Sequence, residues 1–355
     1  MSFDSLVSTY CNKRETGNYM HLHNDNKKLI LSYFDALEGV ADCDVGDVIA
    51  EYTADDYHWY GVYPFGEQSC AADVAEALWT PPLSTWSRLQ RRQDVFMAGT
   101  NEVDGSQWVT SMGHLQGLRD KPWLGIPATG KMTYLRYAEF HHVADGKIQR
   151  SSFFCDIIGV MHQAGINPLP MQTGATNIVP SPKTQDGIQL SQQDAAESTR
   201  TMTLLNQMIA DLDTLNHSGD DRYPAAILER CWHSNMCWYG PAGIGSTYTI
   251  ERYQEQHSYP FREGLKDKIY NGHICRYAEG SYACWFGWPN LTHTPKGGFL
   301  GLPGNELSVD MRVVDVYRRD GDKLAENWVI IDLPWWLKQQ GIDILERCKH
   351  IAIAS

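Results

Sequence analysis

Two aspartates, Asp156 and Asp332, lie near the ends of apolar stretches, residues 153–158 and 329–333. A carboxyl group in such a setting is partly removed from water, and burial raises its pKa. An acid of this kind can take a proton from carbon and return it to oxygen. The same aspartates could instead cap the helices expected to follow them, by accepting backbone N–H bonds. Both interpretations stay open, and we name both residues as candidate acid/base groups.

Strand alternation indicates which neighbours share a face with these aspartates. If Asp156 points into a pocket, Ser152 and Phe154 point the same way, and Trp328 accompanies Asp332. We therefore predict that Ser152, Phe154 and Trp328 form a dry wall for a substrate beside one acid.

Two adjacent histidines, His141 and His142, face opposite sides of the expected strand, so only one can reach a pocket. We predict His142 as the histidine that reaches the pocket and serves there as a hydrogen-bonding partner. The second half has Tyr317 and Arg318 at the corresponding positions, so a histidine-assisted step would belong to the first half alone.

Aromatic residues crowd the second half, and a Trp-Tyr-Gly sequence occurs in both halves. Stacked rings in a concave site suit a flat polycyclic or aromatic ligand. The alternative is a large core with an aromatic contact between the halves. We predict that these members of the two Trp-Tyr-Gly sequences bind substrate: Trp59, Tyr60, Trp238 and Tyr239.

A basic and an acidic residue also recur at a spacing of three: Arg136 with Glu139, and Arg312 with Asp315. This spacing places the two members of each pair on opposite faces of a strand. We interpret all four as partners in cross-strand salt bridges on the sheet surface.

Composition excludes several classes of function. The chain has 355 residues, with 43 acidic and 30 basic residues and a formal charge of −13. Nucleic acid and anionic membranes are therefore poor partners. The sequence has no dinucleotide or phosphate-loop motif and no set of metal ligands at suitable spacing, so we expect no metal or cofactor. The nine cysteines are scattered, which predicts free thiols. With no signal-peptide pattern and no long apolar run, we expect a cytoplasmic location.

An internal repeat sets the architecture. Leu124-Gly125-Ile126-Pro127 recurs 176 residues later as Leu300-Gly301-Leu302-Pro303, and Asp156 recurs as Asp332 at the same offset. Trp59 returns as Trp238, at an offset of 179. The repeat predicts two copies of one fold, with Asp156 matching Asp332 and Trp59 matching Trp238.

Each copy begins with a helical pattern, at residues 30–37 and 205–212, and ends in a strand pattern. The terminal hairpins are expected at 134–140 and 148–158, around Asp145-Gly146, and at 311–317 and 324–333, around residues 320–322. Helices followed by an antiparallel meander indicate an α+β fold. We predict domains at 24–170 and 195–350, joined by a linker at 171–194 that is rich in Pro, Gly, Ser, Thr and Gln.

This order of a helical start, a Trp-Tyr-Gly strand, a Gly-x-Pro loop and a terminal hairpin ending in Asp before a Gln-x-Gly helix resembles the SnoaL-like polyketide cyclases. These belong to the nuclear transport factor 2-like (NTF2-like) superfamily. The resemblance covers both halves, and the second departs from it at Gly304-Asn305 and after its hairpin turn. It implies two tandem cones of curved antiparallel sheet, each wrapped over N-terminal helices, with an apolar pocket at one end.

By this resemblance, the general acid/base role falls on Asp156 and on Asp332. We expect a cofactor-free cyclase or isomerase that acts on a hydrophobic, carbonyl-containing small molecule. The alternative is a non-catalytic protein that binds hydrophobic ligands or acts as a scaffold. Single cones of this superfamily commonly pair through their sheets, so we expect an intrachain pseudo-dimer, with homo-oligomers of the whole chain as a further option.

Overall fold

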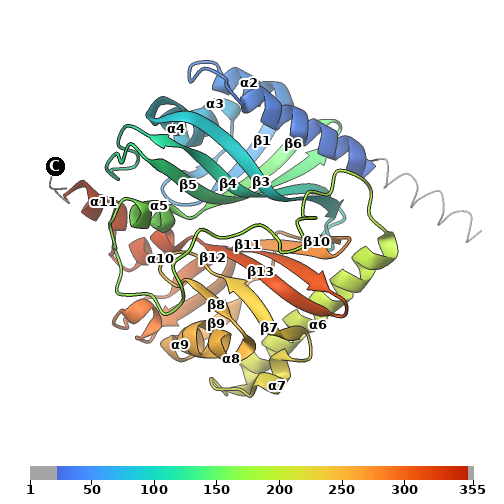
Figure 1. Ribbon diagram of the computed structural model, residues 1–355, viewed down its shortest axis with the longest axis vertical. Coiled ribbons are helices and arrows are strands. Elements are labelled where there is room, and N and C mark those ends of the chain that lie inside the picture. Colours follow the sequence, from blue (N-terminus) through green and yellow to red (C-terminus); the bar gives the residue numbers. More distant parts are fainter. Residues whose placement is uncertain (1–21, 351–355) are drawn as a thin grey trace, which may run out of the picture.

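The computed structural model describes residues 22–350. Figure 1 shows two sheets that face each other across the middle of the molecule, with most helices on their outer sides. The first half of the chain forms one sheet and the second half forms the other. The predicted α+β class with two tandem sheets is confirmed.

The first half starts with a helix over residues 22–37. Its further elements are α2 (Val45–Tyr52), β1 (Thr53–Gly61), β2 (Gly66–Gln68), α3 (Ala71–Val74), the π-helix η1 (Ala75–Trp79), α4 (Thr80–Thr85), β3 (Trp86–Thr100), β4 (Gln107–Arg119), β5 (Met132–Ala144), β6 (Lys147–Cys155) and α5 (Ile157–Gln163).

The second half repeats this plan after a long helix. Its elements are α6 (Ala195–Ser218), α7 (Ala225–Leu228), β7 (Trp232–Tyr239), β8 (Ser246–Tyr248), α8 (Ile250–Tyr253), the π-helix η2 (Gln254–Ser258), α9 (Tyr259–Gly264), β9 (Leu265–Tyr270), β10 (Cys275–Glu279), β11 (Tyr282–Pro295), η3 (Phe299–Gly301), β12 (Val309–Asp320), β13 (Lys323–Ile331), α10 (Leu333–Gln339) and α11 (Ile344–Lys349). Asp194 caps the start of α6 by accepting a hydrogen bond from the backbone N–H of Ala196.

Strand order is the same in both sheets. The first runs β2-β1-β6-β5-β4-β3, and the second runs β8-β7-β13-β12-β11-β10, with β9 paired to β11. Neither order closes residues 22–350 into a barrel. The sheets are mixed and not wholly antiparallel as predicted, because β1 runs parallel to β6 and β7 runs parallel to β13.

The predicted repeat is confirmed residue by residue. Trp59 in β1 pairs with Ser151, and Trp238 in β7 pairs with Asn327. Asp156 and Asp332 are the N-cap residues of α5 and α10. Both halves also contain a π-helix at the same place, η1 and η2, 179 residues apart. The copies therefore share local irregularities as well as strand order.

The terminal hairpins form where the sequence predicts them. Asp145 and Gly146 both have positive φ, which is typical of the tight turn that joins β5 to β6. The predicted strand ends at 158 and 333 are wrong, however. The strands stop at Cys155 and Ile331, because each following aspartate starts a helix.

The two sheets pack against each other through an aromatic contact. Phe286 of β11 lies over Phe140 and Phe154 of the first sheet, with ring centroids 4.9 and 6.0 Å apart. At one edge, Lys27 Nζ and Glu279 Oε1 form a buried ion pair at 2.5 Å. Apolar and charged contacts therefore join the halves.

The segment between α5 and α6 crosses both halves (Figure 1) and has neither helix nor extended strand in residues 164–194. Its backbone is nevertheless anchored. Ile188 forms a bridge with Phe96 of the first sheet, and Ala175 forms one with Ser246 of the second. Pro180 O accepts a hydrogen bond from Trp328 Nε1 (3.0 Å).

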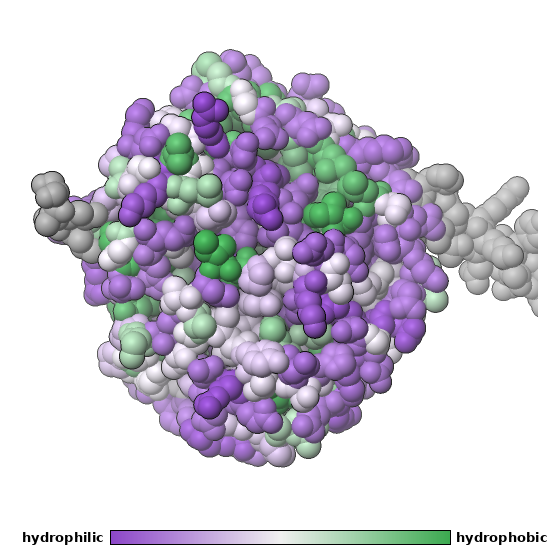
Figure 2. All heavy atoms as spheres, viewed as in Figure 1, coloured by the Kyte–Doolittle hydropathy of each residue, from purple (hydrophilic) through white to green (hydrophobic). Residues whose placement is uncertain are grey.

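Figure 2 shows one face of the molecule, which is mainly hydrophilic. In the view of Figure 2, hydrophobic residues occur as small separate patches among hydrophilic ones. The eight cysteines in residues 22–350 are free thiols, as predicted, and Cys11 lies outside the described residues. No helix in this range is long and apolar enough to cross a bilayer.

Candidate active site

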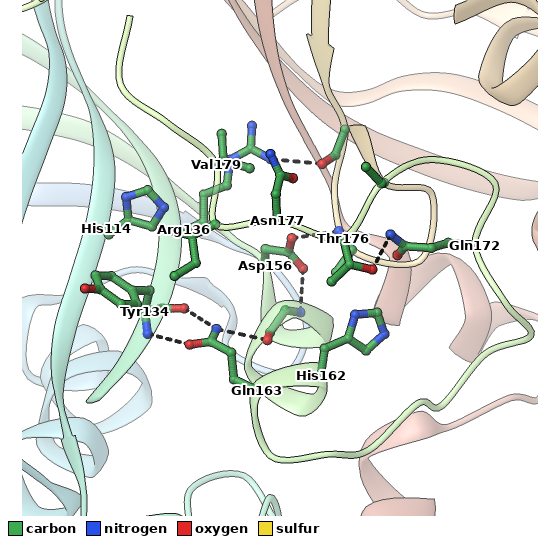
Figure 3. Close-up of a pocket in the computed structure, with 16 residues that line it drawn as sticks. His114, Tyr134, Arg136, Asp156, His162, Gln163, Gln172, Thr176, Asn177 and Val179 are labelled. Carbon is green, nitrogen blue, oxygen red and sulfur yellow. Dashed lines mark hydrogen bonds between the residues drawn. The ribbon is translucent and has the colours of Figure 1, made fainter. Parts of the chain in front are cut away.

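Asp156 lies between the halves, at the start of α5 (Figure 3). Its Oδ1 accepts a hydrogen bond from the N–H of Gly159 (2.9 Å). Its Oδ2 accepts one from the N–H of Ala242, in the second half (2.8 Å). The carboxylate thus caps α5 and ties it to the other half. It also lines a cavity of about 250 Å³, roofed by the linker, which we call the inter-half cavity.

Asp332 makes the equivalent set of contacts in the second half. Its Oδ1 accepts from Trp335 N–H (3.2 Å), and its Oδ2 accepts from Tyr63 N–H of the first half (3.0 Å). Arg312 Nη1 lies 3.5 Å from Oδ2. Burial raises the pKa of Asp332 to about 7. Its side chain is 0% exposed, so a substrate has no access to it in this conformation.

Ser152, Phe154 and Trp328 do lie on the same side of their strands as the two aspartates. That side faces the other half and not the space beneath the helices. Phe154 contacts Trp288 of the second half, with ring centroids 5.6 Å apart, and Trp328 donates to the linker. The three residues share a face, as strand alternation predicts. That face packs against the other half of the chain, however, and does not line a substrate pocket beneath the helices.

His142 lies on this inter-half face as well. Its ring stacks on Trp108, with centroids 5.4 Å apart, and its Nδ1 accepts a hydrogen bond from Arg150 Nε (3.4 Å). Burial and the charge of Arg150 lower the pKa of His142. These contacts do not include Asp156.

The four predicted aromatic residues divide between the two faces. Tyr60 lies against Trp288 (5.5 Å), and Tyr239 stacks on Trp328 (5.6 Å), so both belong to the inter-half face. Trp59 and Trp238 are buried on the opposite face, between the sheets and their helices. We call these inner spaces the first cone and the second cone. The predicted site residues therefore do not form one site.

Glu139 lies inside the first cone, which corrects its assignment to a surface salt bridge. Arg91 Nη1 donates to Glu139 Oε2 (2.8 Å) within a shell of aromatic rings. The guanidinium of Arg91 stacks on Phe34 at 3.8 Å and lies 4.7 Å from Tyr137. Burial opposes ionisation of Glu139, but Arg91 and His141 outweigh it and lower the pKa of the carboxyl. The first cone is therefore filled by side chains around Glu139, whose negative charge is paired with Arg91.

Asp315 occupies the equivalent position in the second cone, and its surface assignment is wrong too. Its Oδ1 accepts hydrogen bonds from Tyr317 Oη (3.0 Å) and Asn327 Nδ2 (2.9 Å). Among residues 22–350 it has no salt-bridge partner. Burial raises its pKa to about 7. This residue was missed as a candidate, although a lone charge among Val313, Val314 and Val316 is a recognisable signal of a functional acid.

A cavity of about 190 Å³ reaches Asp315. Its walls include Trp232, Trp238 and Trp285, so they are largely aromatic. A second cavity of about 190 Å³ adjoins it, since both are lined by Trp285 and Tyr317. The second cone thus offers two adjoining, mostly apolar cavities, one of which has an acid in its wall.

Some polar atoms around this space are buried without a hydrogen-bond partner in residues 22–350. They include Trp285 Nε1, Asn290 Oδ1 and His257 Nδ1. The π-helix η2 places His257 in the cavity wall, where its ring stacks on Trp238 at 4.0 Å. Burial lowers the pKa of His257 to about 3, so the ring is neutral near pH 7. A ligand could satisfy the unpaired donor and acceptors, each of which costs about 1–3 kcal/mol unpaired.

Among the described residues, no three His, Cys, Asp or Glu side chains are arranged to hold a metal ion. The wall of the second cone offers the carboxyl of Asp315 and the hydrogen-bonding groups near it.

Comparisons with known proteins give structural matches only. No protein-family model and no curated protein matches the sequence. A SnoaL-like polyketide cyclase from Jannaschia sp. is 23% identical, with a TM-score of 0.32, covering 41% of this chain and 95% of its own. A polyketide cyclase from Xanthomonas campestris is 19% identical, covering 40% and 98%, with a TM-score of 0.32.

An NTF2-like protein from Burkholderia xenovorans is 10% identical, also with a TM-score of 0.32, and covers 40% of this chain and 96% of its own. Each of these structures spans about the length of one half of the chain. The chain is similar in fold to SnoaL-like polyketide cyclases and NTF2-like proteins.

Proposed function

We propose that the second cone catalyses a cofactor-free proton transfer on a hydrophobic carbonyl compound, with Asp315 as general acid and base. The observation that carries this proposal is the position of Asp315: a buried carboxyl that forms no salt bridge within residues 22–350, in the wall of an aromatic cavity. A pKa of about 7 suits a group that must both accept and return a proton near neutral pH.

The reaction would start when Asp315 removes a proton from the carbon next to the substrate carbonyl. The electron pair of the broken C–H bond then forms an enolate, whose oxygen needs a hydrogen-bond donor. Trp285 Nε1 is an unpaired buried donor in the same cavity wall and could serve it. Return of the proton at another carbon would give isomerisation, and attack of the enolate on a second carbonyl would give aldol-type ring closure.

The substrate class follows from the walls. Trp232, Trp238 and Trp285 favour a flat, apolar molecule that stacks on rings. A small polyketide-like or aromatic ketone has this character. The first cone supports the alternative function, since Arg91 and its aromatic shell surround Glu139. We propose that the first half acts as the packing partner that holds the second half in place.

Asp156 is the matched control for Asp315, because its two oxygens already accept backbone N–H bonds. The probe is β-tetralone, a bicyclic ketone whose exchange of α-protons in D₂O can be followed by NMR. We expect the wild-type chain to accelerate this exchange. Asp315→Asn should lower the acceleration by about 10²–10⁴, the usual contribution of a positioned acid/base. Asp156→Asn should exchange at the wild-type rate.

Tryptophan fluorescence should report that both variants still bind β-tetralone, which separates loss of chemistry from loss of binding. Equal exchange by wild type and Asp315→Asn would refute the proposal. A large loss in Asp156→Asn alone would move the chemistry to the inter-half cavity.

A further inference from the structure

The inter-half cavity contains a buried cation, Arg136, whose charge is stabilised by Asp156, Asp94 and Asp315 from beyond salt-bridge distance. Arg136 of β5 is 5% exposed and lines the cavity. Its Nη1 donates to Gly240 O (3.2 Å) and its Nη2 to Tyr239 O (3.0 Å), both in the second half. No carboxylate of residues 22–350 forms a salt bridge with it. Burial lowers the pKa of Arg136 only to about 10, so the group stays charged at neutral pH.

The symmetry-related position shows how this fold otherwise accommodates such a cation. Arg312, which matches Arg136, lies 3.5 Å from Asp332. Its guanidinium is also covered by Trp288 and Trp335, at 4.0 and 4.9 Å from the ring centroids. In the second half, therefore, an acid pairs with the charge of the guanidinium and two indole rings cover it.

In the first half the matching acid, Asp156, is present, but smaller residues take the place of two large side chains of the symmetry-related site. Gly159 stands where the second half has Trp335, and Ala242 stands where the first half has Tyr63. The backbone is unchanged, since Ala242 N–H and Tyr63 N–H donate to the two capping aspartates in the same way. Both small residues line the inter-half cavity. The cavity thus occupies the space that large side chains fill in the related position.

The other polar groups of the cavity point to the kind of ligand that fits. Figure 3 shows His114 and Arg136 on one side, with Asn177 of the linker close by. Asp94 Oδ2 holds His114 Nδ1 at 3.1 Å, so the other ring nitrogen remains for a ligand. These groups can donate to or accept from a polar oxygen-bearing group beside the guanidinium. Arginine is well suited to a carboxylate, which it can bind with two parallel hydrogen bonds.

Nearby negative charge limits the ligand's own charge. Asp156 lines the cavity and Asp94 lies behind His114, so both oppose an incoming anion. A doubly charged phosphate would be repelled more strongly than a single carboxylate. We propose that the inter-half cavity binds a small organic monocarboxylate, with its carboxylate on Arg136. This site is separate from the second cone and does not rest on the function proposed there.

The test uses benzoate as probe and benzamide as its neutral match, with binding measured by calorimetry. We expect benzoate to bind the wild-type chain at least tenfold more tightly than benzamide. Gly159→Trp should abolish the benzoate site by restoring the ring that the second half carries. A Cβ at Gly159 would lie 3.3 Å from Asp156 Cγ, a close contact that the matching Trp335 and Asp332 accommodate.

Ala242→Tyr fills the same cavity from the opposite wall and provides a second variant if Gly159→Trp does not fold. Binding of β-tetralone is the control, and it should be unchanged in both variants because the second cone is untouched. Equal affinity for benzoate and benzamide would overturn the proposal. So would benzoate binding that persists at wild-type affinity in a folded cavity-filling variant.

Discussion

The two cones place an acid at the same point of the same strand and treat it in opposite ways. Glu139 in β5 has Arg91 at 2.8 Å, and its pKa is lowered. Within residues 22–350, the hydrogen-bond donors to Asp315 in β12 are neutral, and its pKa rises to about 7. The residue of the second half that matches Arg91 is Tyr270, since Arg91 pairs with Leu115 and Tyr270 with the equivalent leucine of β11.

Side-chain packing also differs between the two cones, and the first cone is the more completely filled. The helix over residues 22–37 supplies Tyr33 to the first cone, where α6 supplies the more slender Met208 to the second. The π-helix η1 has Leu78 where η2 has His257. The difference teaches that one copy of a duplicated fold can keep a filled interior with a paired acid, while the other keeps the same acid position open to a ligand.

The largest expected effect comes from breaking the ion pair of the first cone. Arg91→Met would leave Glu139 buried and unpaired, and we expect a loss of about 3–5 kcal/mol in the free energy of unfolding. Adding Glu139→Gln should restore much of this loss, because the buried charge is then gone. Urea unfolding of the single and double variants measures both. A single variant that costs less than about 1 kcal/mol would mean that Glu139 is not sealed from water.

A smaller effect tests whether Trp59 and Trp238 have different roles, one in packing and the other in ligand binding. A Cβ at Gly61 would lie 2.0 Å from the Trp59 ring, and one at Gly240 would lie 2.1 Å from the Trp238 ring. We expect Gly61→Ala and Gly240→Ala each to cost about 1–3 kcal/mol, since the ring must shift in a packed interior.

Only Gly240→Ala should also weaken β-tetralone binding, by several-fold, because Trp238 lines the cavity that reaches Asp315. Thermal unfolding and fluorescence titration of the pair give both quantities. Similar losses of affinity in the two variants would show that the first cone also takes the ligand.

Much of the fold was predictable because duplication doubles every local signal. The matching of Asp156 with Asp332 and the Asp145-Gly146 turn needed only sequence spacing and turn chemistry. The long strands β3 and β4 were not predicted, and half of β3 is polar because one end of it is exposed. Parallel pairing of β1 with β6 also escaped prediction, since it joins segments about ninety residues apart.

The site was harder to predict because alternation gives two faces without saying what covers each. Ser152 and Phe154 do share a face with Asp156, but that face meets the other half of the chain. Asp315 and Glu139 lie on the face under the helices, and only the three-dimensional structure shows that Arg91 reaches one of them and not the other.

The last effect concerns pH. An aspartate in an unfolded chain has a pKa of about 3.9, whereas Asp315 has about 7 in the fold. Between these values the folded state binds more protons than the unfolded state, so this group makes stability fall as pH rises. The slope is at most about 1.4 kcal/mol per pH unit, the value for one proton. Asp332 contributes in the same direction.

Asp315→Asn should remove this dependence for one group, so the difference in unfolding free energy between wild type and variant should change between about pH 4 and pH 7 and be flat above. Glu139, with a lowered pKa, has the opposite sign: its pairing stabilises above about pH 4.3 and is lost on acidification. The double variant at Arg91 and Glu139 should therefore differ from wild type in its pH dependence only at the acid end. Urea unfolding across pH 3–8 measures both differences. Parallel curves for wild type and Asp315→Asn between pH 4 and 7 would mean that Asp315 is ionised throughout, and that the second cone has no acid able to give back a proton near neutral pH.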